Sequence, residues 1–165
     1  MILATDVHYE GERARAAGVL FSAFTDSEPL HTQTRDSTDF GEYAAGEFFR
    51  RELPCILPLI QDLHERVGLN TIVVDGYVDL GTNHPGLGRY VFDALDGAVR
   101  VIGVAKNDFH GAPSRALCRG DSKRALFITC TEDVDRATRE IASMAGAFRL
   151  PALLKHVDQL ARGHV

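Results

Sequence analysis

A short apolar run that ends in an acidic residue constrains this chain more than any other stretch. Residues 71–74 read Thr-Ile-Val-Val and continue directly into Asp75 and Gly76. Four β-branched residues in a row predict a buried central strand that carries a carboxylate at its end, where the chain turns. Ligand sites of open α/β sheets lie outside the carboxyl ends of strands, which makes Asp75 a candidate functional residue. Asp-Gly is also a common turn pair, and from this pair alone a turn-capping Asp75 is the more frequent case.

Length and composition predict one soluble domain over residues 1–165. The chain is 45% hydrophobic and 25% charged, and its length is sufficient to bury a core. Its apolar runs are too short to span a bilayer, so no membrane association is expected. Three cysteines, Cys55, Cys118 and Cys130, form no CxxC pair, which indicates reduced, buried thiols and a cytoplasmic location. The net charge of −5 provides no general attraction to nucleic acid, so such binding requires a local basic patch.

The first half of the chain predicts strands followed by a helix. Three extended runs, over 2–9, 16–24 and 29–35, are separated by turns too short for a crossover helix, which predicts an antiparallel meander. Apolar residues then recur at helical spacing as far as Val67, and the following glycine marks the end of the helix.

Two prolines bear on where this helix begins. Pro54 fits the first turn, and Pro58 either kinks the helix or marks its true start.

The second half alternates between helical and extended patterns, which predicts a mixed sheet with helices on its faces. A polar, glycine-rich loop follows the central strand. The expected elements after it are a helix over 87–95, a buried strand over 100–106, a hairpin over 116–119 and 126–129, a helix with Thr131 as its N-cap, and a last helix opened by Pro151.

Three acidic residues, Asp6, Glu52 and Asp75, lie where predicted elements begin or end, or inside an apolar run. Divalent cations need several hard oxygen ligands close together, and a pair of such ions can promote attack of water on a phosphodiester. Asp6 lies within an apolar run, where an unpaired carboxylate is costly. It therefore either faces a cation or accepts hydrogen bonds from a turn. Spacing alone leaves both interpretations open.

Lys106 and His84 are the other candidates. Lys106 follows an apolar strand and either holds a substrate phosphate or extends into water. His84 precedes Pro85 in the glycine-rich loop, where it orients a water or phosphate or is simply solvated. The sequence contains no nucleophile elbow, P-loop, GxGxxG or zinc-ligand spacing.

Five segments, in order along the chain, resemble motifs of the endonuclease V family. They are Ala-Thr-Asp-Val-His-Tyr over 4–9, the tyrosine-to-proline segment over 43–54, Val-Asp-Gly over 74–76 with His-Pro-Gly-Leu-Gly over 84–88, Gly-Val-Ala-Lys over 103–106, and Phe-Arg-Leu-Pro over 148–151.

The resemblance implies a ribonuclease H-like α/β fold, a mixed sheet with helices on both faces. It also implies a metal-dependent endonuclease that hydrolyses a phosphodiester near a deaminated base (inosine) in DNA or RNA. The partner would be nucleic acid and the cofactor Mg²⁺ or Mn²⁺. Asp6, Glu52 and Asp75 would hold the metal.

The other roles implied by the resemblance concern the substrate. Lys106 would lie against the scissile phosphate, and His84 would assist the metal or the water. Tyr43 would fill the gap left by an everted base, and Gly46 and Gly76 would line the base pocket.

The chain also departs from the family pattern. The loop between Asp75 and His84 is longer, with Tyr77, Val78 and Asp79 inside it, and Ala44-Ala45 replaces the usual proline before the glycine. The segment 127–132 lacks the family's Ser-Pro-Gly, and the chain starts close to Asp6, without the usual preceding segment. These differences concern substrate specificity more than metal binding. The alternative is a catalytically inactive nucleic-acid- or protein-binding module with the same fold; the sequence does not indicate an oligomeric state.

Overall fold

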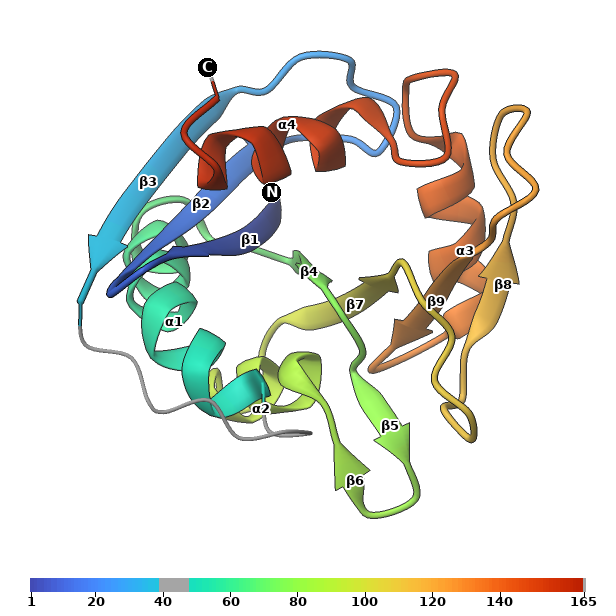
Figure 1. Cartoon of the computed structure of the whole chain (residues 1–165), viewed down its shortest axis with the longest axis horizontal. Helices are drawn as coiled ribbons and strands as arrows, with labels where there is room; N and C mark the ends of the chain where they lie inside the picture. The colour runs from blue at the N-terminus through green and yellow to red at the C-terminus, as the bar shows by residue number, and fades with distance from the viewer. Residues whose placement is uncertain (39–47, 165) are drawn as a thin grey trace.

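A seven-stranded mixed sheet with helices on both faces forms the centre of the molecule (Figure 1). The computed structural model describes residues 1–38 and 48–164. Its elements are β1 (Ile2–Glu10), β2 (Arg13–Phe21), β3 (His31–Ser37), α1 (Phe48–Val67), β4 (Thr71–Asp75), β5 (Asp79–Gly81), β6 (His84–Pro85), α2 (Leu87–Ala94), β7 (Arg100–Ala105), β8 (Arg115–Leu117), β9 (Leu126–Cys130), α3 (Val134–Ser143) and α4 (Ala152–Ala161).

The sheet has the strand order β3-β2-β1-β4-β7-β9-β8. The first three strands form the expected antiparallel meander. The β-branched strand β4 lies at the centre and pairs in parallel with β1 on one side and with β7 on the other. The predicted late hairpin is confirmed as β8 and β9, which pair antiparallel.

Alternating residues of the central strands build two cores, one on each face of the sheet. Val73 and Ile102 point to the face covered by α3 and α4, whereas Ile72 and Val101 point to the face covered by α1 and α2. All four side chains are at most 1% exposed, as expected for strands buried on both faces. Figure 1 shows α4 lying across β1 and β2, on the side opposite α1.

Helix α1 begins earlier than the prolines predicted. It starts at Phe48, so Pro54 lies beyond the first turn, and Pro58 marks no helix start. Both prolines remove a backbone donor from inside the helix, yet the apolar face that includes Ile56 and Leu59 is buried against the sheet. Packing of this face outweighs the local preference against proline. Gly68 ends the helix as predicted, with φ of +64°.

Two smaller predictions are wrong. Thr131 is not the N-cap of α3, because its Oγ1 accepts a hydrogen bond from the Val101 N–H instead. Asp133 caps the helix, and its carboxylate accepts from the N–H groups of Asp135 and Arg136. The cysteines are free but not all buried, since Cys118 is exposed.

The loop after β4 contains a small hairpin that the sequence did not predict. Strands β5 and β6 pair antiparallel, and Figure 1 shows the hairpin extending away from the sheet at the end of β4. Val78, inside the longer loop, is 1% exposed, and its N–H donates to Thr129 Oγ1 at 2.8 Å. A Cβ on Gly103 would lie 2.5 Å from the Gly76 carbonyl oxygen, so glycine is required where this loop crosses β7.

No helix in the described part of the chain is long and apolar enough to cross a membrane.

Candidate active site

The three parallel strands bring candidate residues together at their carboxyl ends. Asp75 is the last residue of β4, and Lys106 directly follows β7. Asp6 lies within β1, one residue beyond Thr5, which is the last residue of β1 that pairs with β4. Asp6 and Asp75 therefore lie on adjacent parallel strands. Beyond this point β1 pairs only with β2, which leaves Asp6 partly exposed.

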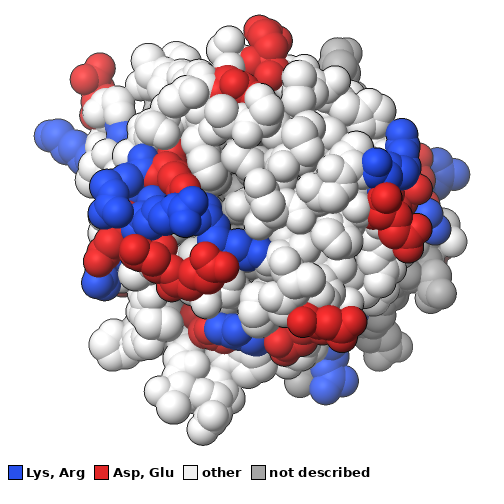
Figure 2. Space-filling view, turned by 180° about the vertical axis from the view of Figure 1, so that it is seen from behind, with Lys and Arg blue, Asp and Glu red and all other residues white. Residues whose placement is uncertain are grey.

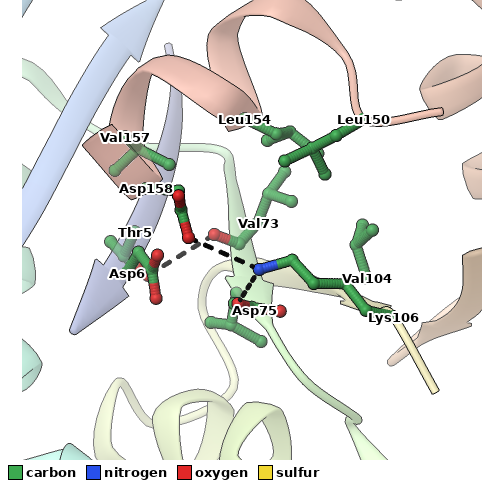
Figure 3. Close-up of a pocket in the computed structure, with 11 residues that line it drawn as sticks. Thr5, Asp6, Val73, Asp75, Val104, Lys106, Leu150, Leu154, Val157 and Asp158 are labelled. Atoms are coloured by element: carbon green, nitrogen blue, oxygen red, sulfur yellow. Dashed lines mark hydrogen bonds and ion pairs between the residues drawn. The ribbon is translucent and has the colours of Figure 1, made fainter. Parts of the chain in front are cut away.

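Lys106 extends its ammonium group between two carboxylates in a small cavity of about 20 Å³ (Figure 3). Its Nζ lies 2.7 Å from Asp75 Oδ2 and 3.6 Å from Asp158 Oδ1. Asp6 lines the same cavity, and apolar side chains of α4 cover one side of it. Lys106 therefore does not simply extend into water.

Glu52 joins the two aspartates from the opposite side. It lies on α1, and with Asp6 and Asp75 it lines a second cavity of about 10 Å³, close to the room that one water molecule needs. Helix α1 covers one face of the sheet and α4 the other, so the acids approach the sheet edge from both layers.

The acids perturb one another strongly. Burial and then the charge of Asp75 raise the pKa of Asp6 to about 7, against a partial opposing effect of Lys106. Burial, then Asp75, then Asp6, raise the pKa of Glu52 to about 8. For Lys106, burial lowers the pKa, but the charge and hydrogen bond of Asp75 outweigh it, so the pKa is raised and the ammonium stays protonated. One lysine therefore does not neutralise this cluster.

The donor set fits a hard divalent cation in chemistry. Three carboxylates with uncompensated repulsion surround a cavity of ion size, and carboxylate oxygens are the ligands that Mg²⁺ prefers. In their present rotamers, however, no three His, Cys, Asp or Glu side chains of residues 1–38 and 48–164 lie close enough together to hold an ion. Binding would therefore require these side chains to turn toward one another.

Asp158 on α4 is a member of this cluster that sequence reasoning missed. Arg162 holds it through contacts of 3.1 and 3.3 Å, and burial is outweighed by this hydrogen bond and by the charge of Lys106, so its pKa is lowered. A sequence signal existed. Leu154 and Ala161, four residues before and three after, are buried on the same helix face, where an acid stands out.

A larger cavity of about 200 Å³ adjoins the acids. Glu52, Asp75 and Gly76 line it together with Phe49 and Tyr77. The backbone of Gly76 has a φ of +143°, which favours glycine, and its role in a base pocket stays a prediction.

Of the predicted site residues, one lies apart from the acids and two fall outside the described residues. Tyr43 and Gly46 lie outside the described residues. His84 is exposed on β6, where its ring contacts Phe109, and it lines neither of the two acid cavities. Its assistance to the metal or water stays a prediction.

Arg119, which lies in the turn between β8 and β9, has a structural role. Arg119 is 8% exposed, and its guanidinium donates to backbone carbonyls, including that of Phe148 at 2.8 Å, so it fixes the loop before α4. Arg13 and Arg15, in contrast, line a pocket of about 100 Å³ next to Asp158, and this pocket is also lined by His8, Arg162, Glu10 and Asp36. Arg15 pairs with Asp36, whereas Arg13 is exposed and makes no ion pair within the described ranges.

Figure 2 shows a different picture on the face turned away from the viewer of Figure 1. Basic and acidic side chains lie there in mixed clusters beside a broad uncharged area. The described residues of that face therefore form no continuous basic surface.

Comparison with known proteins agrees with this arrangement. A profile of the endonuclease V family matches residues 1–148. The chain belongs to the endonuclease V family. Endonuclease V of Pyrococcus abyssi is 30% identical over 168 residues, covering 99% of this chain and 80% of that protein. Endonuclease V of Pyrococcus horikoshii is 29% identical over 167 residues, covering 99% and 74%.

Solved endonuclease V structures share the fold. The catalytic domain of human endonuclease V superposes with a TM-score of 0.81 at 23% identity, covering 99% of this chain and 81% of that one. Endonuclease V of Ciona intestinalis, in complex with a DNA that contains an inosine followed by a ribo-adenosine, gives a TM-score of 0.83 at 15% identity, covering 98% and 84%. The predicted ribonuclease H-like fold is confirmed.

Proposed function

We propose that this chain is a metal-dependent endonuclease that hydrolyses a phosphodiester near a deaminated base, inosine, in DNA or RNA. The observation that carries the proposal is the convergence of Asp6, Glu52 and Asp75 with Lys106 at one edge of the sheet. Membership of the endonuclease V family supports it, as does the inosine-containing DNA bound by the Ciona relative.

Asp6, Glu52 and Asp75 would hold Mg²⁺ or Mn²⁺, with Asp158 as a fourth carboxylate beside them. When bound, such an ion supplies activation of a water and stabilisation of the leaving oxygen. The raised pKa values of Asp6 and Glu52 reflect the repulsion that a bound cation would relieve.

Lys106 would orient the scissile phosphate. Its ammonium is held by Asp75 at 2.7 Å and remains charged, so it can attract a phosphate oxygen at the edge of the acid cluster. Cleavage would leave a 3′-hydroxyl and a 5′-phosphate.

The cavity of about 200 Å³ would take the everted base. Phe49, which stacks on Tyr90 at 3.9 Å between ring centroids, supplies an aromatic wall, and Gly76 allows close approach of the backbone. Tyr43 and Gly46 would complete the wedge and pocket, by their match to the family motif. The acid cavity shares Glu52 and Asp75 with the base cavity, which couples recognition to cleavage.

One observation favours a second candidate function, an inactive binding module with the same fold. In their present rotamers, the described acids do not lie close enough together to hold a metal ion, and Lys106 pairs with Asp75 instead. Under this alternative, Lys106 replaces the cation permanently.

A cleavage assay separates the two functions. Inosine-containing DNA and RNA oligonucleotides, and matched oligonucleotides with adenine, are incubated with the protein with and without Mg²⁺. We expect cleavage only with inosine and Mg²⁺. Binding of the inosine oligonucleotides without cleavage at any Mg²⁺ or Mn²⁺ concentration would establish the inactive module.

A further inference from the structure

We propose that Tyr77, His84 and Phe109 form a stacking subsite for an unpaired nucleobase, at the rim of the cavity that adjoins the acids. The inference rests on the proposed function, because the subsite would hold a second base of the strand whose phosphodiester is cleaved.

Three aromatic rings from two separate segments meet at this rim. The ring centroid of Phe109 lies 6.1 Å from that of Tyr77 and 6.0 Å from that of His84. The two contacts are inclined by 59° and 77°, so neither ring lies parallel over Phe109. Phe109 is 40% exposed and His84 is exposed, whereas Tyr77 is buried beneath them. An exposed aromatic ring with a supported edge is a suitable surface for base stacking.

The rim is anchored rather than loose. The Tyr77 hydroxyl donates to the Asn107 carbonyl at 2.6 Å and joins the hairpin segment to the loop after β7. Asp79 at the start of β5 forms an ion pair of 2.7 Å with Arg89 of α2. Together with the buried Val78, these contacts hold the rings in place before any ligand binds. Preorganised surfaces bind with a smaller ordering cost.

Two of the three rings lie close to the acid site along the chain. Tyr77 is two residues beyond Asp75 and lines the larger cavity with it, and Phe109 is three residues beyond Lys106. A strand with one phosphate at Lys106 therefore has its neighbouring nucleotides within reach of the rings. Asp108 precedes Phe109, and its charge acts on the Tyr77 hydroxyl. An acidic neighbour disfavours a phosphate at this position, which is consistent with a base there.

The test measures binding without divalent metal, by fluorescence anisotropy of a labelled single-stranded DNA with one inosine. We expect Phe109→Ala to weaken binding roughly 5- to 150-fold, the range that base–aromatic stacking gives. Phe109→Leu keeps the apolar bulk and should lose most of the same affinity. Phe148→Ala is the matched control, because Phe148 is 72% exposed in the loop before α4, and this substitution should leave binding unchanged. Melting temperatures establish that each variant is folded.

An abasic scan identifies the stacked base. Each base flanking the inosine is replaced in turn by an abasic residue. At the position of the stacked base, the losses of affinity from the abasic change and from Phe109→Ala should not be additive. Additive losses at every position, or equal losses from Phe109→Ala and Phe148→Ala, would overturn the subsite. If the unaltered protein binds and cleaves while Phe109→Ala behaves identically, only the subsite is wrong. If the unaltered protein binds no oligonucleotide, the proposed function fails as well.

Discussion

Asp6 shows how a carboxylate inside an apolar strand becomes available for chemistry. The preceding residue, Thr5, is the last residue of β1 that pairs with β4, so Asp6 projects where the parallel pairing ends. Its Oδ1 accepts a hydrogen bond of 2.8 Å from the Val7 N–H. This bond stabilises the ionised carboxylate and offsets part of the effect of burial on its pKa.

Asp75→Asn tests the role of the residue shared by both acid cavities. Cleavage should be lost, because the substitution removes a ligand charge while keeping the shape of the side chain. The melting temperature without metal should change by no more than about 3 °C, since loss of the Lys106 ion pair opposes relief of repulsion with Glu52.

Asp62→Asn, on the exposed side of α1, is the matched control and should cleave normally. Full metal-dependent cleavage by Asp75→Asn would place the site elsewhere.

At the scale of elements, the hairpin β5–β6 is the part that folded against expectation. A longer, glycine-rich loop normally indicates irregular structure, but here Val78 is drawn into the core between α2 and β7. The side chain of Thr129, on the neighbouring strand β9, satisfies the buried N–H of Val78. A contact between residues 51 positions apart in the chain thus fixes the local structure.

Thr129→Val should loosen this hairpin. The substitution keeps the shape but leaves the Val78 N–H without an acceptor, at a cost of about 1–3 kcal/mol. We expect the melting temperature to fall by several degrees and amide hydrogen exchange to rise selectively over residues 77–86.

Thr138→Val removes a hydroxyl that donates to the Val134 carbonyl within α3, and it should have little effect on either measurement. Unchanged exchange over the hairpin in Thr129→Val would contradict the anchoring role.

At the scale of the whole molecule, the site draws its charges from both layers of the fold. Strands β1, β4 and β7 supply one edge, α1 supplies Glu52 from one face, and α4 supplies Asp158 from the other. Bringing these acids together lowers the free energy of unfolding of the whole domain. That free energy therefore depends on pH and on cations.

Without divalent metal, stability should fall as pH rises from about 4 to about 8. Asp6 and Glu52 have folded pKa values of about 7 and about 8, above their ordinary values of 3.8 and 4.5. The folded state therefore keeps protons that the unfolded state has released, and each rise in pH favours unfolding. Urea unfolding in EDTA across this window measures the slope. Glu52→Gln should flatten it, and added Mg²⁺ should restore stability at pH 8. Stability that rises with pH over this window would contradict the assigned repulsion between the acids.

Nucleic-acid binding by a chain of net charge −5 should depend on a local basic patch. If Arg13 contacts a phosphate, log K for a single-stranded inosine oligonucleotide falls with log salt by about 0.7 per phosphate neutralised. Arg13→Gln should reduce the slope by about that amount. Arg66→Gln, at an exposed ion pair on α1, should leave it unchanged. Binding that is independent of salt would exclude the Arg13 pocket.

The sequence by itself predicted most strands of the main sheet, the central position of β4, and three acids and a lysine as candidate site residues. Those features follow from local patterns, because β-branched runs, helical spacing and turn residues act over a few neighbours. The sequence pattern overestimated the effect of Pro54 and Pro58 on where α1 begins. Burial of an apolar helix face against the sheet outweighs the loss of a backbone donor.

Only the tertiary structure decided which charged residues meet. Asp158 joins Lys106 from a helix 52 positions along the chain, and Arg119 is buried under backbone carbonyls instead of facing a ligand. The Tyr77–His84–Phe109 cluster likewise depends on how the hairpin packs beside the loop after β7. Local patterns carry no information on such distant contacts, because these depend on how strands pair and how helices pack on the finished sheet.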